Sequence, residues 1–235
     1  MLDFLAVGDV MLDVKLPAPA ALRRAHHGAI ESGPGGSAVN AARAATRLGA
    51  TAAVAGAVGD DTLGKILRME LEAAGVTPLL DVVPGAATGT VVYGPAIVAD
   101  RGANADYVPH DLPAARVTLV SGYLSAEGRA RALELASGLR AIDLQGVLAD
   151  ETNADVVLGP QIDLDLDHAV VCSTLGADGA EARRGEERAR VRPPRVLNEP
   201  VIGAGDAFAT GFLLALVEGA SLEDALGRGC GAVTG

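Results

Sequence analysis

Continuous apolar runs alternate along the chain with segments whose apolar residues recur at helical spacing. Residues 4–7 and 52–58 are such runs, and a Gly-Asp pair follows each of them. Short apolar runs that end in turns are typical of strands buried on both faces. Residues 37–48 and 63–74 carry alanine or leucine at helical spacing, and a glycine that suits a C-cap follows each segment. This alternation predicts a layered α/β domain.

The same pattern predicts the remaining elements. It indicates strands at residues 117–120, 142–147 and 169–172, and helices at 125–139 and 207–216. Residues 88–99 and part of 16–30 are extended pieces that glycine and proline interrupt. We expect these pieces to form a small accessory sheet, and the charged residues 181–195 to form a solvated hairpin or loop.

The composition disfavours several classes of protein. The 235 residues are enough for one main core, 49% of them are hydrophobic, and no uncharged run approaches the roughly 18 residues of a membrane span. The N-terminal segment MLDFLAVGDVMLDV has no basic residues ahead of its apolar stretch, so it lacks the layout of a secretory signal. We therefore expect a cytoplasmic protein with no membrane partner. A formal net charge of −11 also disfavours nucleic acid as a partner.

The segment VIGAGDAFATGF carries the strongest chemical signal. Gly203, Ala204 and Gly205 are small enough for the backbone to run close to a ligand, and a helix is expected to begin there. Unpaired amides at a helix start favour a phosphate, and the neighbouring Asp206 carboxylate can accept a proton from a hydroxyl. The pairing points to phosphoryl transfer. The alternative is a well-capped helix whose glycines serve close packing.

A second glycine-rich segment, GPGGSAVNAARAATRLGA, is open to three interpretations. In the first, Gly35 and Gly36 admit a polyhydroxylated ligand such as a sugar to the backbone, and Asn40 offers it an amide. In the second, Gly33, Gly35 and Ala38 match a dinucleotide-binding pattern, but the strand that this pattern requires ahead of its first glycine is missing from the sequence. In the third, the glycines form a purely structural turn.

Two further segments offer candidate ligand contacts. Asp13 follows the first predicted strand, where ligands of open α/β sheets bind, and its carboxylate suits two hydroxyl donors. In VVCSTLGADGA, a strand ends in Thr174, Gly176 and Gly179, which allow a second approach of a ligand to the backbone. Simple turns are the alternative for both segments.

Taken together, these segments resemble the ribokinase-like carbohydrate kinase family, also called the phosphofructokinase-B type. GGSAVNAARAATRLGATAAVAGAVGDD is similar to the N-terminal signature of that family, and VIGAGDAFATGF is similar to its C-terminal signature. The resemblance implies a single three-layer α/β domain over residues 1–235, with a central, mostly parallel sheet and a small β-sheet lid. The lid segments would lie near residues 14–32 and 86–108, and the lid could pair two subunits into a homodimer.

The resemblance also implies roles for individual residues. Asp206 would be the catalytic base, and an anion hole for the phosphoryl group would be formed by Gly203, Ala204 and Gly205. The sugar hydroxyls would contact Asp13, Gly35, Gly36 and Asn40. The ATP site, with Mg²⁺ bridging the phosphates, would include Thr174, Gly176 and Gly179.

The sequence departs from the family at two places. Pro200 and Val201 stand where the family often has Asp-Thr at a monovalent-cation site, so we do not expect potassium activation. The middle of the chain has no clean Asn-x-x-Glu motif, for which Glu151 and Asn153 are weak substitutes, and the metal ligands therefore stay unassigned.

The sequence supports an ATP-dependent kinase that phosphorylates a hydroxyl of a sugar or nucleoside. A binding protein of the same fold with weakened catalysis is the alternative. Recognition of a sugar phosphate would need nearby arginines such as Arg23, Arg24 or Arg101, which the sequence does not place, so a neutral acceptor is favoured.

Overall fold

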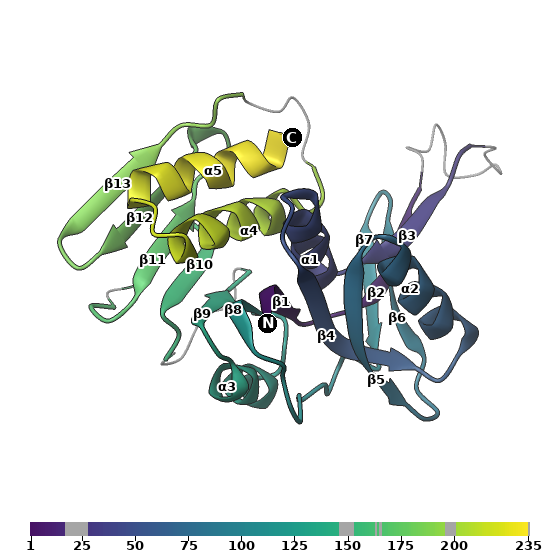
Figure 1. The fold of residues 1–235 in the computed structure, drawn as a ribbon. Coiled ribbons are helices and arrows are strands. Elements are labelled where there is room, and N and C mark those ends of the chain that lie inside the picture. Colours follow the sequence, from purple (N-terminus) through teal and green to yellow (C-terminus); the bar gives the residue numbers. More distant parts are fainter. Residues whose placement is uncertain (17–27, 146–152, 163, 165, 196–200, 235) are drawn as a thin grey trace.

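The computed structural model describes residues 1–16, 28–145, 153–162, 164, 166–195 and 201–234 (Figure 1). Within these residues, one sheet has nine strands, which from one edge to the other are ordered β13-β12-β11-β10-β9-β8-β1-β4-β5. In chain order their bounds are β1 Leu2–Val7, β4 Ala52–Gly59, β5 Val76–Val83, β8 Ala115–Ser121, β9 Leu139–Asp143, β10 Val156–Pro160, β11 Val170–Thr174, β12 Ala180–Arg184 and β13 Glu187–Val191.

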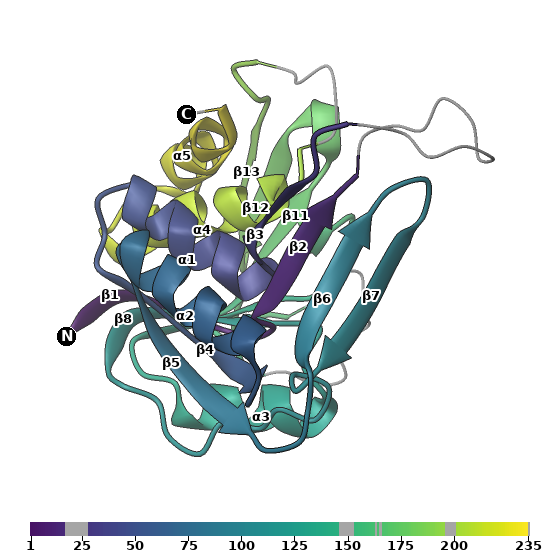
Figure 2. The same ribbon diagram turned by 90° about the vertical axis from the view of Figure 1, so that its right-hand side faces the viewer.

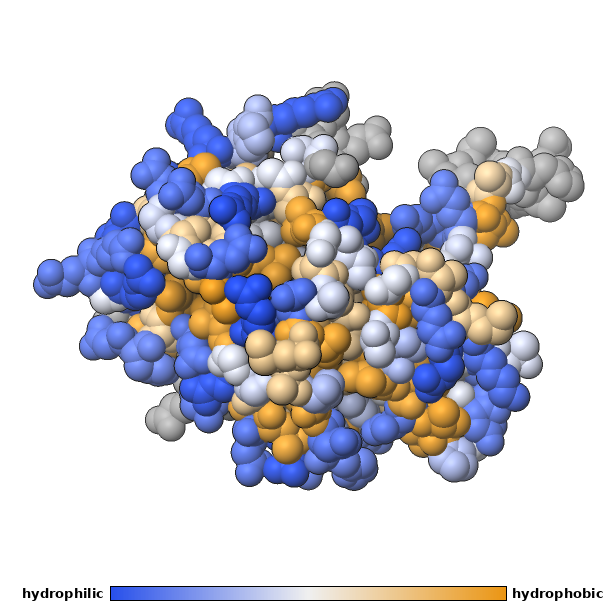
Figure 3. All heavy atoms as spheres, viewed as in Figure 1, coloured by the Kyte–Doolittle hydropathy of each residue, from blue (hydrophilic) through white to orange (hydrophobic). Residues whose placement is uncertain are grey.

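The seven strands from β5 to β11 are parallel, so their carboxyl ends lie along one edge of the sheet. At this edge, Ser121 at the end of β8 is paired with Asp143 at the end of β9, and Pro160 at the end of β10 is paired with Thr174 at the end of β11. Among the described strands of this sheet, antiparallel pairing occurs only at one end, between β11 and β12 and within the β12–β13 hairpin. Hydrophilic residues cover that hairpin (Figure 3, left), as its charged sequence predicted.

Helices cover both faces of the sheet because side chains in buried strands point alternately to the two sides. Phe4 and Ala6 belong to the core cluster beneath α1, α2, α4 and α5, whereas Leu5 and Val7 belong to the cluster beneath α3. The helix bounds are α1 Ser37–Arg47, α2 Thr62–Ala73, α3 Ala126–Leu135, α4 Ala204–Val217 and α5 Leu222–Thr234. The predicted layered α/β architecture is therefore confirmed (Figure 1).

A second sheet has four strands in the order β3-β2-β6-β7, with bounds β2 Met11–Lys15, β3 Glu31–Gly35, β6 Thr88–Tyr93 and β7 Ile97–Gly102. β2 and β6 are parallel, and the outer two pairs are antiparallel. Figure 2 shows the four strands side by side, beyond the ends of α1 and α2. The predicted accessory sheet is present, although residues 17–27 of its first predicted segment lie outside the described residues.

Several predicted boundaries are wrong. Residues 32–35, which the sequence pattern did not assign to a strand, form most of β3, because β2 offers an antiparallel partner and an edge strand tolerates the missing donor of Pro34. The helix predicted at 125–139 ends at Leu135, because Gly138 adopts a positive φ of 67° and β9 begins at Leu139. The sequence pattern also missed β5 and β10, and residues 146 and 147 of the predicted strand at 142–147 lie outside the described part.

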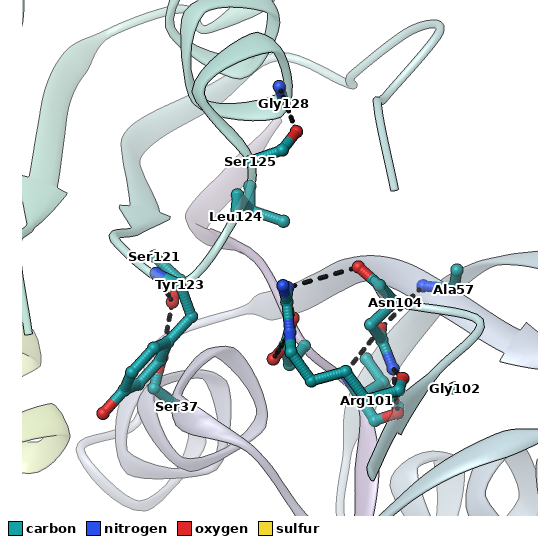
Figure 4. Close-up of polar contacts among 12 residues, drawn as sticks. Ser37, Ala57, Arg101, Gly102, Asn104, Ser121, Tyr123, Leu124, Ser125 and Gly128 are labelled. Atoms are coloured by element: carbon teal, nitrogen blue, oxygen red, sulfur yellow. Dashed lines mark hydrogen bonds and ion pairs between the residues drawn. The ribbon is translucent and has the colours of Figure 1, made fainter. Parts of the chain in front are cut away.

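A buried amide joins the two sheets. Asn104 is 0% exposed, and its Oδ1 accepts from the backbone N–H groups of Val10 and Ala57 at 3.0 and 3.2 Å. Its Nδ2 donates to the carbonyls of Val10 and Arg101 at 3.0 and 3.2 Å. Arg101 in turn forms a two-pronged ion pair with the buried Asp9, with distances of 2.9 and 2.6 Å. Its Nη2 also donates to the Asn104 carbonyl at 3.2 Å (Figure 4). The segment after β7 is thereby tied to the turn after β1.

We predict that Asn104→Ala lowers the free energy of unfolding by about 2–4 kcal/mol, because it leaves buried backbone groups without partners. Urea unfolding followed by circular dichroism measures the loss. Asn153→Ala, at an exposed position, is the matched control and should change stability by less than about 0.5 kcal/mol. An equally small effect of Asn104→Ala would contradict a structural role for this amide.

Candidate functional site

Helix α4 begins at the glycine-rich turn of the segment VIGAGDAFATGF. Gly203 is its N-cap with φ +81° in the left-handed region, where glycine is the favoured residue, and no side chain caps this helix start. Ala204 is the first helical residue, and a Cβ added to Gly205 would meet nothing within 4 Å. The Ala204 N–H donates to the Val201 carbonyl at 3.1 Å. The open space beside Gly205 leaves room for an anion at the positive end of the helix dipole.

Asp206 lies in the first turn of α4 and is only 7% exposed. Its Oδ2 accepts a hydrogen bond from Asn40 Nδ2 on α1 at 3.1 Å, and its Oδ1 accepts one from Gln145 Nε2 at 3.4 Å. Burial and, to a smaller extent, the charge of Asp143 together raise the pKa of Asp206 to about 7, and the hydrogen bond from Asn40 opposes the shift. The structure thus joins the two glycine-rich motifs at one carboxylate that is poised to exchange a proton near neutral pH.

Sequence reasoning missed Asp143 and Gln145. Asp143 is the last residue of β9, and burial raises its pKa to about 6. The backbone N–H and the Nε2 of Gln145 both donate to this carboxylate, at 3.2 and 2.8 Å, so the Gln145 side chain bridges Asp143 and Asp206. Gln145 adopts a φ of +50°, which is uncommon for a residue other than glycine. The one signal in the sequence for Asp143 was an acidic residue inside the strand predicted at 142–147. The hydrophobic pattern did not show that this strand ends at Asp143.

Asp13 lies on β2 and is buried beneath the backbone of β3. A Cβ on Gly35 would come within 1.9 Å of Asp13 Cγ, so only glycine at this position leaves room for the carboxylate. The Tyr93 side chain forms a hydrogen bond with Asp13, while Oδ1 is buried with no hydrogen-bond partner. Burial raises the pKa of Asp13. Because a buried oxygen without a partner is costly, Asp13 fits a ligand that donates a hydroxyl hydrogen.

Gly36, the next residue, leaves room for the backbone of the turn after β1. Gly36 has φ +97°, and a Cβ there would come within 2.3 Å of the Asp9 carbonyl oxygen. Asp13, Asn40 and Gly203 together line a cleft of about 380 Å³ between β2, β3, α1 and α2. The structure therefore places two of the four predicted sugar-binding residues, Asp13 and Asn40, and the start of α4 around one space, whereas Gly35 and Gly36 are not among its described lining residues.

The third predicted group lies farther along the carboxyl edge of the large sheet. Thr174 ends β11, and its hydroxyl donates to the Gly159 carbonyl at 3.5 Å. Gly176 and Gly179 follow with φ values of +59° and +94°, and a Cβ on Gly179 would come within 1.9 Å of the Val191 carbonyl oxygen. Gly179 thus has a packing role in the hairpin. None of the three is among the described residues that line the cleft.

The structure describes two of the four residues at which the sequence departs from the family pattern. Val201 is 53% exposed at the approach to α4, while Pro200 and Glu151 lie outside the described residues and Asn153 is exposed. Among the described residues, no group of three or more His, Cys, Asp and Glu side chains could hold a metal ion. Within the same ranges, every helix falls short of the length and apolar character that a membrane span requires.

The chain is similar in sequence and in fold to known proteins. The model of the pfkB family carbohydrate kinases matches residues 1–164 and 158–234. A ribokinase of Bacillus subtilis (strain 168) is 29% identical, over 82% of this chain and 77% of the relative. Among solved structures, a ribokinase from Thermotoga maritima superposes with a TM-score of 0.82 at 19% identity, over 99% of this chain and 92% of that one. Adenosine kinase from Sinorhizobium meliloti superposes with a TM-score of 0.79 at 23% identity, over 99% and 93%.

The buried carboxylate of Asp206 generates a prediction about stability. Its folded-state pKa of about 7 lies above its ordinary value of 3.8, so the native state favours the protonated form. The stabilisation from that proton is complete at low pH and is lost as the pH rises through about 7. We therefore expect Asp206→Asn to raise the melting temperature at pH 8 and to raise it much less at pH 5.

Differential scanning fluorimetry at the two pH values measures this effect. Asp111→Asn, at an exposed position, is the control and should show no such difference between pH 5 and pH 8. Equal shifts for Asp206→Asn at both pH values would mean that this carboxylate is ionised at little cost.

Proposed function

Because this chain belongs to the pfkB family of carbohydrate kinases, we propose that it transfers the γ-phosphoryl group of ATP to a hydroxyl of a sugar or nucleoside. The family match confirms the resemblance that the motifs predicted, and the chain is a carbohydrate or nucleoside kinase. The single observation that carries the finer proposal is the Asp206 carboxylate, which lies between Asn40 and the uncapped start of α4.

In this proposal Asp206 is the general base. The acceptor hydroxyl donates its hydrogen to the carboxylate, and the oxygen attacks the γ-phosphorus while the bond to the β-phosphate oxygen breaks. Charge that develops on the transferred group meets the amides of Gly203, Ala204 and Gly205 at the start of α4. A base with a pKa near 7 suits a reaction at neutral pH, because it is partly ionised and still accepts a proton.

The acceptor would bind in the cleft that β2, β3, α1 and α2 line. Asp13 Oδ1 accepts from one of its hydroxyls, and the Asn40 amide contacts another. Gly35 and Gly36 shape this site by leaving room for the Asp13 carboxylate and the Asp9 carbonyl. The four-stranded sheet would cover this site as a lid, with segments near 14–32 and 86–108. Support for the acceptor class comes from a ribokinase of Arabidopsis thaliana, whose structure is described as complexed with ribose and ATP.

The nucleotide would lie along the carboxyl edge of the large sheet, toward Thr174, Gly176 and Gly179. When bound, ATP supplies the phosphoryl group and Mg²⁺ neutralises its phosphates. Mg²⁺ commonly binds through one or two carboxylates together with substrate phosphates, and the buried Asp143 has the right chemistry at this edge. The Cryptococcus neoformans ribokinase, whose structure is described as a complex with ADP, supports a nucleotide of this class.

Two further features belong to the proposal. Ile97 and Val98 on the edge strand β7 are 71% and 64% exposed, and an apolar edge strand of this kind supports a homodimer formed through the lid.

Because ATP is an intracellular substrate, we also propose that the protein works in the cytoplasm.

A substrate panel read out by ADP formation tests the function. The purified chain is incubated with ATP and Mg²⁺ and with ribose, fructose, adenosine, a sugar phosphate or a sugar acid, and ADP release is measured by a coupled assay. Release that depends on one acceptor supports the proposal. Calorimetric binding of an acceptor without any ADP release would instead favour a binding protein.

We predict that Asp206→Asn lowers kcat by about 10²–10⁴ and changes the acceptor KM little, because general-base catalysis has this magnitude. In the wild type, kcat should fall as the pH drops below about 7, where Asp206 becomes protonated. The coupled assay between pH 5.5 and 9 measures both effects. A normal rate of the Asp206→Asn variant would remove this residue from the role of base.

We further predict that Asn40→Ala raises the acceptor KM more than the ATP KM. It should also move the acid limb of the pH profile to higher pH, because the bond from Asn40 lowers the pKa of Asp206. Initial rates at several pH values check both effects, with the exposed Asp111→Asn as control. A larger change in the ATP KM would place the two pockets the other way round.

A further inference from the structure

One helix face extends the acceptor cleft away from the reacting carboxylate. Asn40, Arg43 and Arg47 are spaced i, i+3 and i+7 on α1, and all three line the same cleft as Asp13. With a rise of about 1.5 Å per residue, Arg43 lies about 4.5 Å and Arg47 about 10.5 Å along the helix axis from Asn40. The two arginines therefore follow Asn40 along the same side of the cleft, at a backbone spacing comparable with the length of one sugar.

Arg43 has unused hydrogen-bonding capacity in this position. It is half-buried, and its Nη1 donates to the Pro34 carbonyl at 3.2 Å. No carboxylate of the described residues lies within ion-pair distance of it, whereas Arg101 and Arg140 each form a two-pronged pair with an aspartate. A guanidinium has five N–H donors, so most of those on Arg43 are available to a ligand in the cleft.

The other charged groups that line the cleft are of both signs. Lys15, one of two lysines in the chain, adds a cation from β2. The acidic residues are Asp13, Glu31 and Glu70, and the Glu70 carboxylate lies beside Gly33, 3.9 Å from where a Cβ would stand. Asp13 is engaged with acceptor hydroxyls in the proposed function. Arg43 is the cation nearest along α1 to Asn40, and neither it nor Arg47 forms an ion pair with a described carboxylate.

We propose that the acceptor carries an anionic group, a phosphate or a carboxylate, at the end remote from the phosphorylated hydroxyl, and that Arg43 binds this group with support from Arg47. A guanidinium binds both kinds of anion through two parallel hydrogen bonds. The inference rests on the proposed function and differs from the neutral acceptor that the sequence favours. Of the arginines considered there, Arg101 is committed to Asp9, and Arg23 and Arg24 lie outside the described residues.

Matched acceptor pairs test the inference. Ribose is compared with ribose 5-phosphate, fructose with fructose 6-phosphate, and glucose with gluconate, by ADP formation and by calorimetric binding. We expect an anionic member to show a KM and a Kd at least about tenfold lower than its neutral partner, because charge-assisted bidentate bonds are the stronger ones. The phosphate and carboxylate arms identify which anion the cleft takes.

Variants assign the effect to residues. Arg43→Ala should raise the KM and Kd of the preferred anionic acceptor by about 10- to 100-fold and those of the neutral partner by much less. Arg43→Lys should restore part of the loss, and Arg47→Ala should show a smaller loss. Arg131→Ala, which removes an exposed ion pair on α3, is the control. Thermal melting shows whether each variant is folded.

The outcomes separate the inference from the proposed function. If the wild type releases ADP but prefers neutral acceptors, the inference is wrong while the kinase activity stands. The same holds if Arg43→Ala and Arg43→Lys, both folded, bind the anionic acceptor as the wild type does. If no acceptor leads to ADP release, the proposed function fails, and calorimetric binding of an anionic acceptor that depends on Arg43 would still support the anion site.

Discussion

The site depends on one buried carboxylate that three distant parts of the chain hold in place. Asp206 lies in the first turn of α4, Asn40 reaches it from α1, and Gln145 reaches it from the segment after β9. A charged carboxylate is costly to bury, and hydrogen bonds from two amides offset part of that cost. The position of Asp206 therefore couples the packing of α1 and α4 to the geometry of the sheet edge.

Two other buried carboxylates, those of Asp13 and Asp143, act electrostatically on Asp206. Asp13, Asp143 and Asp206 are all buried, and burial raises the pKa of each one. Carboxylates gathered in this way destabilise the native state when they are all ionised, so packing elsewhere must offset the cost. The all-round apolar helix α4 and the Asn104 network between the sheets supply such packing and hydrogen bonding. Perturbed acids of this kind are typical of functional sites.

The sequence predicted the parts of the site that obey local rules. Glycines in the two motifs marked where the backbone approaches another group, and the structure shows that approach at Gly35 against Asp13 and at Gly36 against Asp9. It did not predict β3, because a Gly- and Pro-rich segment becomes a strand only when a partner strand is present. It also missed Gln145, whose importance comes from a bridge between residues 61 positions apart in the sequence.

What the sequence determined by itself was the alternation of strands and helices, the family and a set of candidate site residues, because periodicity and short motifs are local properties. What only the tertiary structure decided was which of these groups meet. Asn40 and Asp206 are 166 positions apart, and Arg43 is placed in the acceptor cleft only because α1 packs against α4 beside β3. Burial, and with it the pKa of each carboxylate, depends on the same long-range packing, since desolvation is a property of the folded interior and not of the residue.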